Sequence, residues 1–358
     1  MSRLAVAHVD IAALAFNHAR LRAMAAPARL MAVIKADGYG HGLERVARAL
    51  HGADAFGVAA IADGQRLRAA GHRERIVVLS GPDGPDDLAE LRRLDLEAVI
   101  HHDSQLRWLE AESVGAPLRI WLKVDSGMHR LGFAPGRVTE VHARLSRLPH
   151  VHREIVLMTH FAASDEFGKS TTTMQIDAFE AATRGLDGPR SLSNSAGLLG
   201  WPGARGDWVR AGGLLYGLTV VEGKTGADHG MRPALRLCTR LIAINRVGQG
   251  EGIGYAGTWT CPEDMPVGIA AIGYGDGYPR SAPSGTPVLV GGREVPLIGR
   301  VSMDLTALDL RQAPDAQVGD EVVLWGPELP AERVAAAAGT ISYQLTCGLT
   351  RRVLFMEA

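Results

Sequence analysis

Over the first two thirds of the chain, short apolar runs alternate with amphipathic stretches. The runs are typical of buried strands, and the stretches between them, such as residues 85–94 and 175–184, carry apolar residues at the three- and four-residue spacing of helices. Strands are expected at residues 29–35, 55–61, 75–81, 96–102, 118–125, 154–160, 190–195 and 208–217. Strands that alternate with helices build parallel sheets. Eight of them favour an α/β fold with a closed (β/α)8 barrel of the TIM type, and an open doubly wound sheet is the alternative.

The pattern changes at about residue 231. From there, short apolar or alternating segments, among them residues 235–247 and 286–292, are separated by glycine, proline and aspartate turns, and helical periodicity is weak. We therefore expect a barrel over residues 10–229 and a β-rich C-terminal domain over residues 230–358. The alternating segment at about residues 1–9 is expected to add a strand to the second domain.

Charge and cysteine content exclude several classes of protein. The 38 lysines and arginines against 39 aspartates and glutamates leave a net charge of −1, so the chain has no surplus of positive charge for nucleic acid or an anionic membrane. The N-terminus lacks an export-type apolar segment, and no apolar run reaches about 18 residues. The three cysteines lie far apart with no CxxC spacing, which argues against disulfides and a cysteine zinc site. We expect a cytoplasmic protein without a metal.

Candidate chemistry lies where the barrel strands end, because the active site of such a barrel is at the C-terminal ends of its strands. Lys35 closes the first strand. A lysine in this place commonly extends to solvent. An amine held between apolar walls is instead shifted towards its neutral form, which forms a Schiff base with an aldehyde. The residues alone leave both interpretations open.

Other strand ends carry groups that suit an anionic ligand. Tyr39 lies in a glycine-rich turn before a helix, Ser195 lies in SNSAG, and Gly212 and Gly213 follow Arg210, so three loops are positioned to converge on one phosphate. In WLKVDSGMHRLGF, the Arg130 guanidinium suits a substrate carboxylate. His160 ends the sixth strand, where a core histidine is the alternative.

Nine motifs occur along the chain in one order: AVIKADGYGHG, KVDSGMHRLGF, THFAASD, SNSAG, VRAGGLLYG, IGYAGTW, IGYGDGY, GRVSMDLT and ISY. With them the chain resembles the alanine racemases, pyridoxal-phosphate enzymes with a barrel and a β-rich domain. The resemblance implies that Lys35 is the Schiff-base lysine. It implies that pyridoxal 5′-phosphate is bound by Lys35, Tyr39, His160, Asn194, Ser195, Arg210, Gly212, Gly213 and Tyr343.

The remaining site residues also follow from the resemblance. Arg130 and the backbone of Met303 would bind the substrate carboxylate, and Lys123 aligns with a lysine that is carbamylated in some members. The corridor through which substrate enters would be lined by Asp165, Tyr274, Arg280, Arg300 and Asp304.

Racemisation needs a base on each face of the planar intermediate, and the resemblance assigns these bases to Lys35 and Tyr255. Because a tyrosine has an ordinary pKa near 10, Tyr255 needs cationic neighbours, for which His160 and Arg210 are candidates. Arg210 would face the pyridine nitrogen. A guanidinium with a pKa above about 12 leaves that nitrogen unprotonated, which favours racemisation over transamination.

The implied activity is the interconversion of L- and D-alanine by two-base proton transfer at Cα of the pyridoxal-phosphate aldimine, supplying D-alanine for peptidoglycan. The implied assembly is a homodimer with shared active sites. Three alternatives remain: a broad-specificity or serine racemase, a related amino-acid decarboxylase, and a non-catalytic pyridoxal-phosphate carrier. Arg210 and Tyr255 argue against the decarboxylase, and the second domain argues against the carrier. Small departures from the family pattern at Ser126, Ala256, Gly275 and Gln344 leave the substrate range open. The sequence does not distinguish a biosynthetic from a catabolic role.

Overall fold

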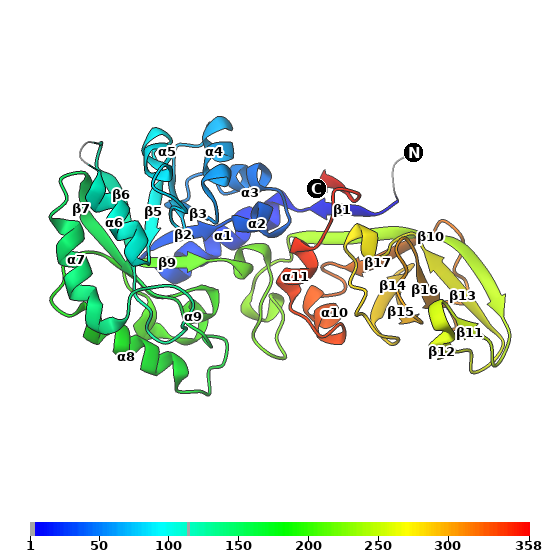
Figure 1. Cartoon of the computed structure of the whole chain (residues 1–358). Helices are drawn as coiled ribbons and strands as arrows, with labels where there is room; N and C mark the ends of the chain where they lie inside the picture. Colours follow the sequence, from blue (N-terminus) through cyan, green and yellow to red (C-terminus); the bar gives the residue numbers. More distant parts are fainter. Residues whose placement is uncertain (1–3, 113–114) are drawn as a thin grey trace.

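The computed structural model describes residues 4–112 and 115–358, so the first three residues of the expected N-terminal strand lie outside the described part. A sheet surrounded by helices forms one end of the elongated chain, and a β-rich domain forms the other (Figure 1). The predicted α/β barrel with a β-rich C-terminal domain is confirmed.

The strands of the barrel run parallel to one another in the order β8-β7-β6-β5-β4-β3-β2-β9. Backbone hydrogen bonds from Asp207 to Arg190 (2.8 Å) and from Arg210 to Ser193 (3.0 Å) close the ring between β8 and β9. Each predicted strand is present, and most of them are shorter than expected. Their bounds are β2 (Arg29–Val33), β3 (Ala55–Val58), β4 (Arg75–Val78), β5 (Glu97–Ile100), β6 (Leu118–Lys123), β7 (Val151–Met158), β8 (Arg190–Ser191) and β9 (Trp208–Ala211).

Helices connect these strands and cover the outside of the barrel. The first is α1, whose N-terminus is capped by Asp10 through a 2.7 Å hydrogen bond from the Ala13 amide. The helices of the barrel are α1 (Ile11–Ala25), α3 (Leu43–Ala49), α4 (Ile61–Ala69), α5 (Asp87–Arg93), α6 (Asp103–Ala111), α7 (Val138–Ser146), α8 (Thr171–Thr183) and α9 (Ser195–Gly200). The amphipathic stretches predicted as helices correspond to α5 and α8.

Two tryptophans fill the interior of the barrel. Trp121 and Trp208 pack edge to face with their ring centroids 5.4 Å apart, and both are fully buried. The Trp121 indole donates a 2.7 Å hydrogen bond to Glu97, which also accepts one of 2.9 Å from Arg75. Because Arg75 and Glu97 are the first residues of β4 and β5, this ion pair lies at the end of the barrel where the strands begin.

The second sheet has the order β13-β16-β15-β14-β17-β10-β1-β18, and β13 also pairs with β10, so its larger part closes on itself. The strands are β1 (Val6–Val9), β10 (Leu235–Val247), β13 (Met265–Ala270), β14 (Pro287–Val290), β15 (Arg293–Ile298), β16 (Thr306–Asp309), β17 (Glu321–Trp325) and β18 (Leu354–Glu357). A separate pair comprises β11 (Gly252–Ile253) and β12 (Trp259–Thr260). The domain also contains two short helices that were not expected, because helical periodicity is weak there: α10 (Ala331–Ala337) and α11 (Ser342–Cys347).

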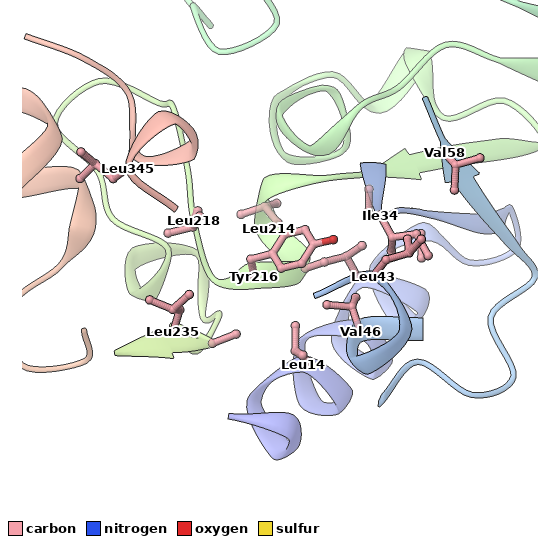
Figure 2. Packing of buried hydrophobic residues seen from close by; sticks show 14 of the residues in the cluster. Leu14, Ile34, Leu43, Val46, Val58, Leu214, Tyr216, Leu218, Leu235 and Leu345 are labelled. Carbon is pink, nitrogen blue, oxygen red and sulfur yellow. The ribbon is translucent and has the colours of Figure 1, made fainter. Parts of the chain in front are cut away.

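The two domains share one apolar core. Leu14, Ile34 and Tyr216 from the barrel and its last turn belong to the same buried cluster as Leu235 on β10 and Leu345 on α11 (Figure 2). This packing fixes α11 beside the mouth of the barrel. In the described ranges, no helix has the length and apolarity needed to cross a membrane.

Candidate active site

A cavity of about 380 Å³ lies at the C-terminal ends of the barrel strands. It collects residues from strand ends and loops distributed over more than 300 positions of the sequence. Twelve residues predicted for the site line it: Lys35, Tyr39, Lys123, Arg130, His160, Asp165, Asn194, Ser195, Arg210, Gly212, Gly213 and Tyr343.

Lys35 lies directly before a turn with unusual backbone geometry. Ala36, Asp37, Gly38 and Tyr39 all have φ values between 52° and 63°, in the left-handed region. Each non-glycine residue there costs roughly 1–2 kcal/mol. The Asp37 side chain stabilises the turn by accepting a 3.1 Å hydrogen bond from the Leu43 amide. Strained backbone is often retained where it serves a function. Here the turn directs the side chains of both Lys35 and Tyr39 into the cavity.

The surroundings of Lys35 favour its neutral amine. Burial lowers the pKa of Lys35, and the nearby charges of Arg130 and Arg210 lower it further. Of the two interpretations left open by the sequence, the structure therefore supports the desolvated amine.

The cavity has a strongly positive lining, with Lys35, Lys123, Arg130 and Arg210 close enough to affect one another. Lys123 is buried, and burial together with the other three cations lowers its pKa to about 8. Positive groups held this close in a buried site are stabilised by an anionic ligand.

Arg210 is held by four neutral oxygen atoms and one ring nitrogen. Its Nη1 donates to the carbonyl oxygen (2.8 Å) and to Oγ (2.7 Å) of Ser191, and its Nη2 donates to the carbonyl oxygens of Thr159 (2.6 Å) and Leu192 (3.1 Å). Burial lowers the pKa of Arg210 to about 10, below the value above 12 expected from the sequence. Arg210 therefore stays charged at pH 7, in a fixed orientation.

His160 accepts the fifth interaction, at 3.3 Å between its Nδ1 and Nη2 of Arg210. Burial, and then the charges of Arg210, Lys123, Arg130 and Lys35, lower the pKa of His160 well below its usual value. His160 is thus a neutral imidazole at pH 7. The structure does not support the expectation that His160 supplies positive charge to Tyr255, because burial, and then the cations around it, disfavour its protonation.

Glycine leaves room for two phenols at the edge of the cavity. A Cβ atom at Gly212 would stand 2.6 Å from Oη of Tyr39, and one at Gly213 would stand 2.1 Å from Oη of Tyr343. Ser195 adds a hydroxyl, which accepts a 2.9 Å hydrogen bond from the Gly212 amide. Together these two phenols, the hydroxyl and the glycine backbone form a cradle whose donors suit a phosphate. The same cavity also holds the Lys35 amine, which suits the aldehyde of pyridoxal phosphate, and the Arg210 guanidinium, which suits its ring.

Asn194 lines the cavity but has a structural task as well. Its Oδ1 accepts a 2.8 Å hydrogen bond from the Gly197 amide, which caps the N-terminus of α9. The same oxygen accepts a 2.9 Å hydrogen bond from the Ser164 hydroxyl. Asn194 therefore holds Ser195 in place at the start of that helix.

Six predicted site residues do not line this cavity within one chain: Tyr255, Tyr274, Arg280, Arg300, Met303 and Asp304. All belong to the second domain. Tyr255 is 68% exposed and lies in η5 (Tyr255–Gly257), between β11 and β12. Figure 1 shows these two strands at the end of the second domain remote from the barrel. Arg210 and Tyr255, expected to be neighbours, are thus far apart in a single chain.

Several lining or supporting residues were missed by the sequence analysis. Ser191 and Thr159 hold Arg210, and Ser164 holds Asn194. Thr159 and Ser164 lie in the family motif THFAASD, but nothing in the sequence indicates that they, or Ser191 in its strand, support Arg210 and Asn194. Arg352, which contacts Asp304, was also missed because it follows the recognisable motifs.

Comparisons with known proteins agree with this geometry. A profile of the alanine racemase N-terminal domain matches residues 9–220, and one of the alanine racemase C-terminal domain matches residues 234–356. The chain belongs to the alanine racemase family. Family membership makes it an isomerase and disfavours the decarboxylase and carrier alternatives.

Individual relatives of the alanine racemase family match over almost the whole chain. The alanine racemase of Shewanella baltica (strain OS185) is 49% identical over 347 residues, which are 97% of each chain. That of Halorhodospira halophila is 49% identical over 354 residues, 99% of this chain and 97% of the relative. The crystal structure of the biosynthetic alanine racemase from Pseudomonas aeruginosa has a TM-score of 0.97 and 42% identity, with full coverage of both chains.

Proposed function

We propose that this chain interconverts L- and D-alanine with pyridoxal 5′-phosphate as its cofactor. The observation that carries the proposal is one cavity that holds both Lys35, whose pKa is lowered by burial, and the cradle of Tyr39, Ser195, Gly212, Gly213 and Tyr343. When bound, the cofactor supplies an aldehyde for amines and an electron sink that acidifies the Cα proton.

Arg210 tunes that electron sink. It keeps its proton at pH 7, since its pKa of about 10 lies well above neutrality despite burial. Its fixed guanidinium would therefore not pass a proton to the pyridine nitrogen of a bound cofactor, and a neutral His160 would not do so either. A weaker electron sink favours return of the proton to Cα, which suits racemisation.

Two bases of one site would come from two chains. Lys35 serves one face of the substrate carbon, and Tyr255 serves the other, by removing or returning the Cα proton. The exposure of Tyr255, and its distance from the barrel mouth of its own chain, support a homodimer in which each barrel is covered by the β-rich domain of its partner.

Substrate carboxylate binding is assigned to Arg130 and the Met303 amide. Arg130 lines the cavity close to Lys123. A pKa of about 8 leaves a useful fraction of Lys123 as the neutral amine that reacts with carbon dioxide, and the resulting carbamate would give Arg130 an anionic partner. Asp165 on the barrel, with Tyr274, Arg280, Arg300 and Asp304 from the partner, would line the corridor.

Alanine is the proposed substrate, and a cytoplasmic, biosynthetic role that supplies D-alanine for peptidoglycan is the proposed setting. The Pseudomonas aeruginosa relative, 42% identical, is described as biosynthetic. A broad-specificity or serine racemase remains the alternative to be tested.

The test of the function combines activity and cofactor attachment. Purified protein with pyridoxal phosphate is incubated with L-alanine, L-serine and other L-amino acids, and the enantiomers are resolved. Racemisation of alanine well above that of serine is expected, and equal rates would favour the broad-specificity alternative. Borohydride reduction should attach the cofactor to Lys35, and Lys35→Ala should abolish both results. An adduct mapped to another lysine would refute the assignment of Lys35.

A further inference from the structure

Arg352 bridges two loops of the second domain. It lies between α11 and β18, and its guanidinium donates a hydrogen bond to Asp304. Its Nε also lies 3.2 Å from Oδ1 of Asp276, a fully buried carboxylate in η6 (Tyr274–Asp276). One side chain thus pairs with carboxylates on both sides, and its planar guanidinium suits such a two-point contact.

The backbone joins the same two loops and sets the direction of one peptide. The Tyr274 amide donates a 3.0 Å hydrogen bond to the carbonyl oxygen of Ser302, and the Gly275 amide donates one of 2.8 Å to that of Met303. In a trans peptide the N–H points opposite to the C=O. The Met303 N–H, which shares its peptide with the Ser302 carbonyl, therefore points away from η6.

Gly275 makes room for the guanidinium. A Cβ atom at Gly275 would stand 2.2 Å from Nη1 of Arg352 and 3.0 Å from the carbonyl oxygen of Met303. Thr350, two residues before Arg352, also binds η6. Its hydroxyl donates a 3.0 Å hydrogen bond to the Gly275 carbonyl oxygen, and its amide donates one of 3.1 Å to the Asp276 carbonyl oxygen. The segment leading to Arg352 is therefore packed against η6 through backbone contacts that need glycine.

We propose that Arg352 is a positioning residue for the substrate carboxylate, acting by holding the Met303 peptide in its orientation. The inference rests on the proposed function of the Met303 amide. Arg352 does not line the cavity of the barrel and lies outside the cofactor cradle. Its loss should therefore weaken binding of the carboxylate while cofactor binding is preserved.

The test compares Arg352→Ala with Arg351→Ala, an exposed neighbour whose removal causes the same change of charge. Arg352→Ala should raise KM for alanine about tenfold with kcat changed less than about twofold, which is the pattern of lost binding common to ground and transition states. The inhibition constant of acetate, a carboxylate without an amine, should rise by a similar factor. Arg351→Ala should change neither constant, and both variants should keep the visible spectrum of the bound cofactor.

Hydrogen exchange supplies a readout that does not depend on activity. Amides of residues 302–305 should exchange faster in Arg352→Ala than in wild type or Arg351→Ala. Gly275→Ala should act in the same direction by displacing the guanidinium. In the Arg352→Ala background only its direct contact with the Met303 carbonyl oxygen remains, so its added effect should be smaller there than in wild type. Arg352→Lys should fall between wild type and alanine, since one ammonium group replaces a two-point contact.

The possible outcomes separate the two proposals. Equal exchange and equal KM in Arg352→Ala and Arg351→Ala would overturn the positioning role. If Arg352→Ala does not fold, Gly275→Ala and Arg352→Lys decide in the same way. Wild-type protein that fails to racemise alanine refutes the proposed function. A third outcome is that the amides of residues 302–305 exchange faster while KM and acetate binding stay unchanged. That outcome leaves the proposed function intact but overturns the proposal that Arg352 positions the substrate carboxylate.

Discussion

Gly213 and Tyr343 lie so close together that a Cβ atom at Gly213 would stand 2.1 Å from the phenolic oxygen of Tyr343. One residue belongs to the turn after β9 and the other to α11, so the contact joins the barrel to the second domain beside the cavity. Tyr343 is partly buried against the apolar core, and this burial raises the pKa of its hydroxyl well above the usual value. A neutral phenol that stays protonated is suited to donate a hydrogen bond to a phosphate.

Gly213→Ala should therefore weaken cofactor binding. The added methyl group displaces the Tyr343 hydroxyl, and an affinity loss of tenfold or more, about 1.4 kcal/mol, is expected. Titration of apoprotein with pyridoxal phosphate, followed by absorbance, measures it. Gly203→Ala is the matched control, because a Cβ atom there meets nothing within 4 Å. Equal affinities of the two variants would remove Gly213 and Tyr343 from the cradle.

Arg210→Glu should change the outcome of the reaction. A carboxylate in this position stabilises a protonated pyridine nitrogen and a stronger electron sink, so pyruvate formation by transamination should rise while racemisation falls roughly 100-fold, the scale of one lost electrostatic group. Chiral chromatography and a pyruvate assay measure the two products.

Arg205→Glu is the control for Arg210→Glu, since Arg205 is exposed and the change of charge is the same. Circular dichroism checks that the buried substitution leaves the fold intact, and Arg210→Lys, which keeps the charge and loses the multiple contacts, replaces it if the fold is lost. Unchanged partitioning between racemisation and transamination would mean that Arg210 does not face the ring.

His41 should make the protein sensitive to acid. Its Nδ1 lies 2.9 Å from the carbonyl oxygen of Tyr39 and 3.1 Å from that of Gly38, and burial lowers the pKa of His41 to about 4. The unfolded chain, with a pKa near 6.5, then binds a proton first as the pH falls. The contribution of His41 to the free energy of unfolding is therefore fully present above pH 6.5. This contribution, at most about 3 kcal/mol, is lost as the pH falls from 6.5 to 4.

Urea unfolding between pH 8 and pH 4 measures this contribution. In His41→Asn the free energy of unfolding should depend less on pH over that range, although its value at pH 8 is lower. His51→Asn is the control, because the His51 side chain is 93% exposed. An identical pH dependence in wild type and His41→Asn would show that His41 is not buried in its neutral form.

The sequence was sufficient for the barrel because strand position depends on local pattern. Each of the eight apolar runs buries its side chains in the sheet, and the polar residue that ends a run, such as Lys35 or His160, is brought to the same rim by parallel topology. The family motifs of the barrel, together with ISY, then identified twelve groups that line one cavity.

Other features depend on contacts between distant segments. Ser191 supports Arg210 across 19 positions, and Arg352 reaches Asp304 across 48, so neither partner is visible in a local pattern. The lowered pKa of His160 follows from its burial and then from four cations that the fold places near it. The left-handed turn after Lys35 includes three residues other than glycine, and a sequence pattern gives no reason to expect that conformation.

The exposed position of Tyr255 leads to a test of shared sites. Lys35→Ala and Tyr255→Phe, each inactive alone, are dissociated together and allowed to reassemble. If each site combines the Lys35 of one chain with the Tyr255 of the other, a mixed dimer has one site with both defects and one intact site. About half of randomly paired dimers are mixed, so activity should return to about a quarter of wild type.

Each variant reassembled alone is the control, and both should remain inactive. Subunit exchange is verified by a tag on one variant, so that absence of recovery is informative. If both bases came from one chain, every site in a mixed dimer would carry one defect and activity would not return. Tyr255 would then have to reach the Lys35 of its own chain, which would require the β-rich domain to separate from the apolar core that joins Leu235 and Leu345 to the barrel. Because that core is buried and continuous, recovery of activity is the expected result.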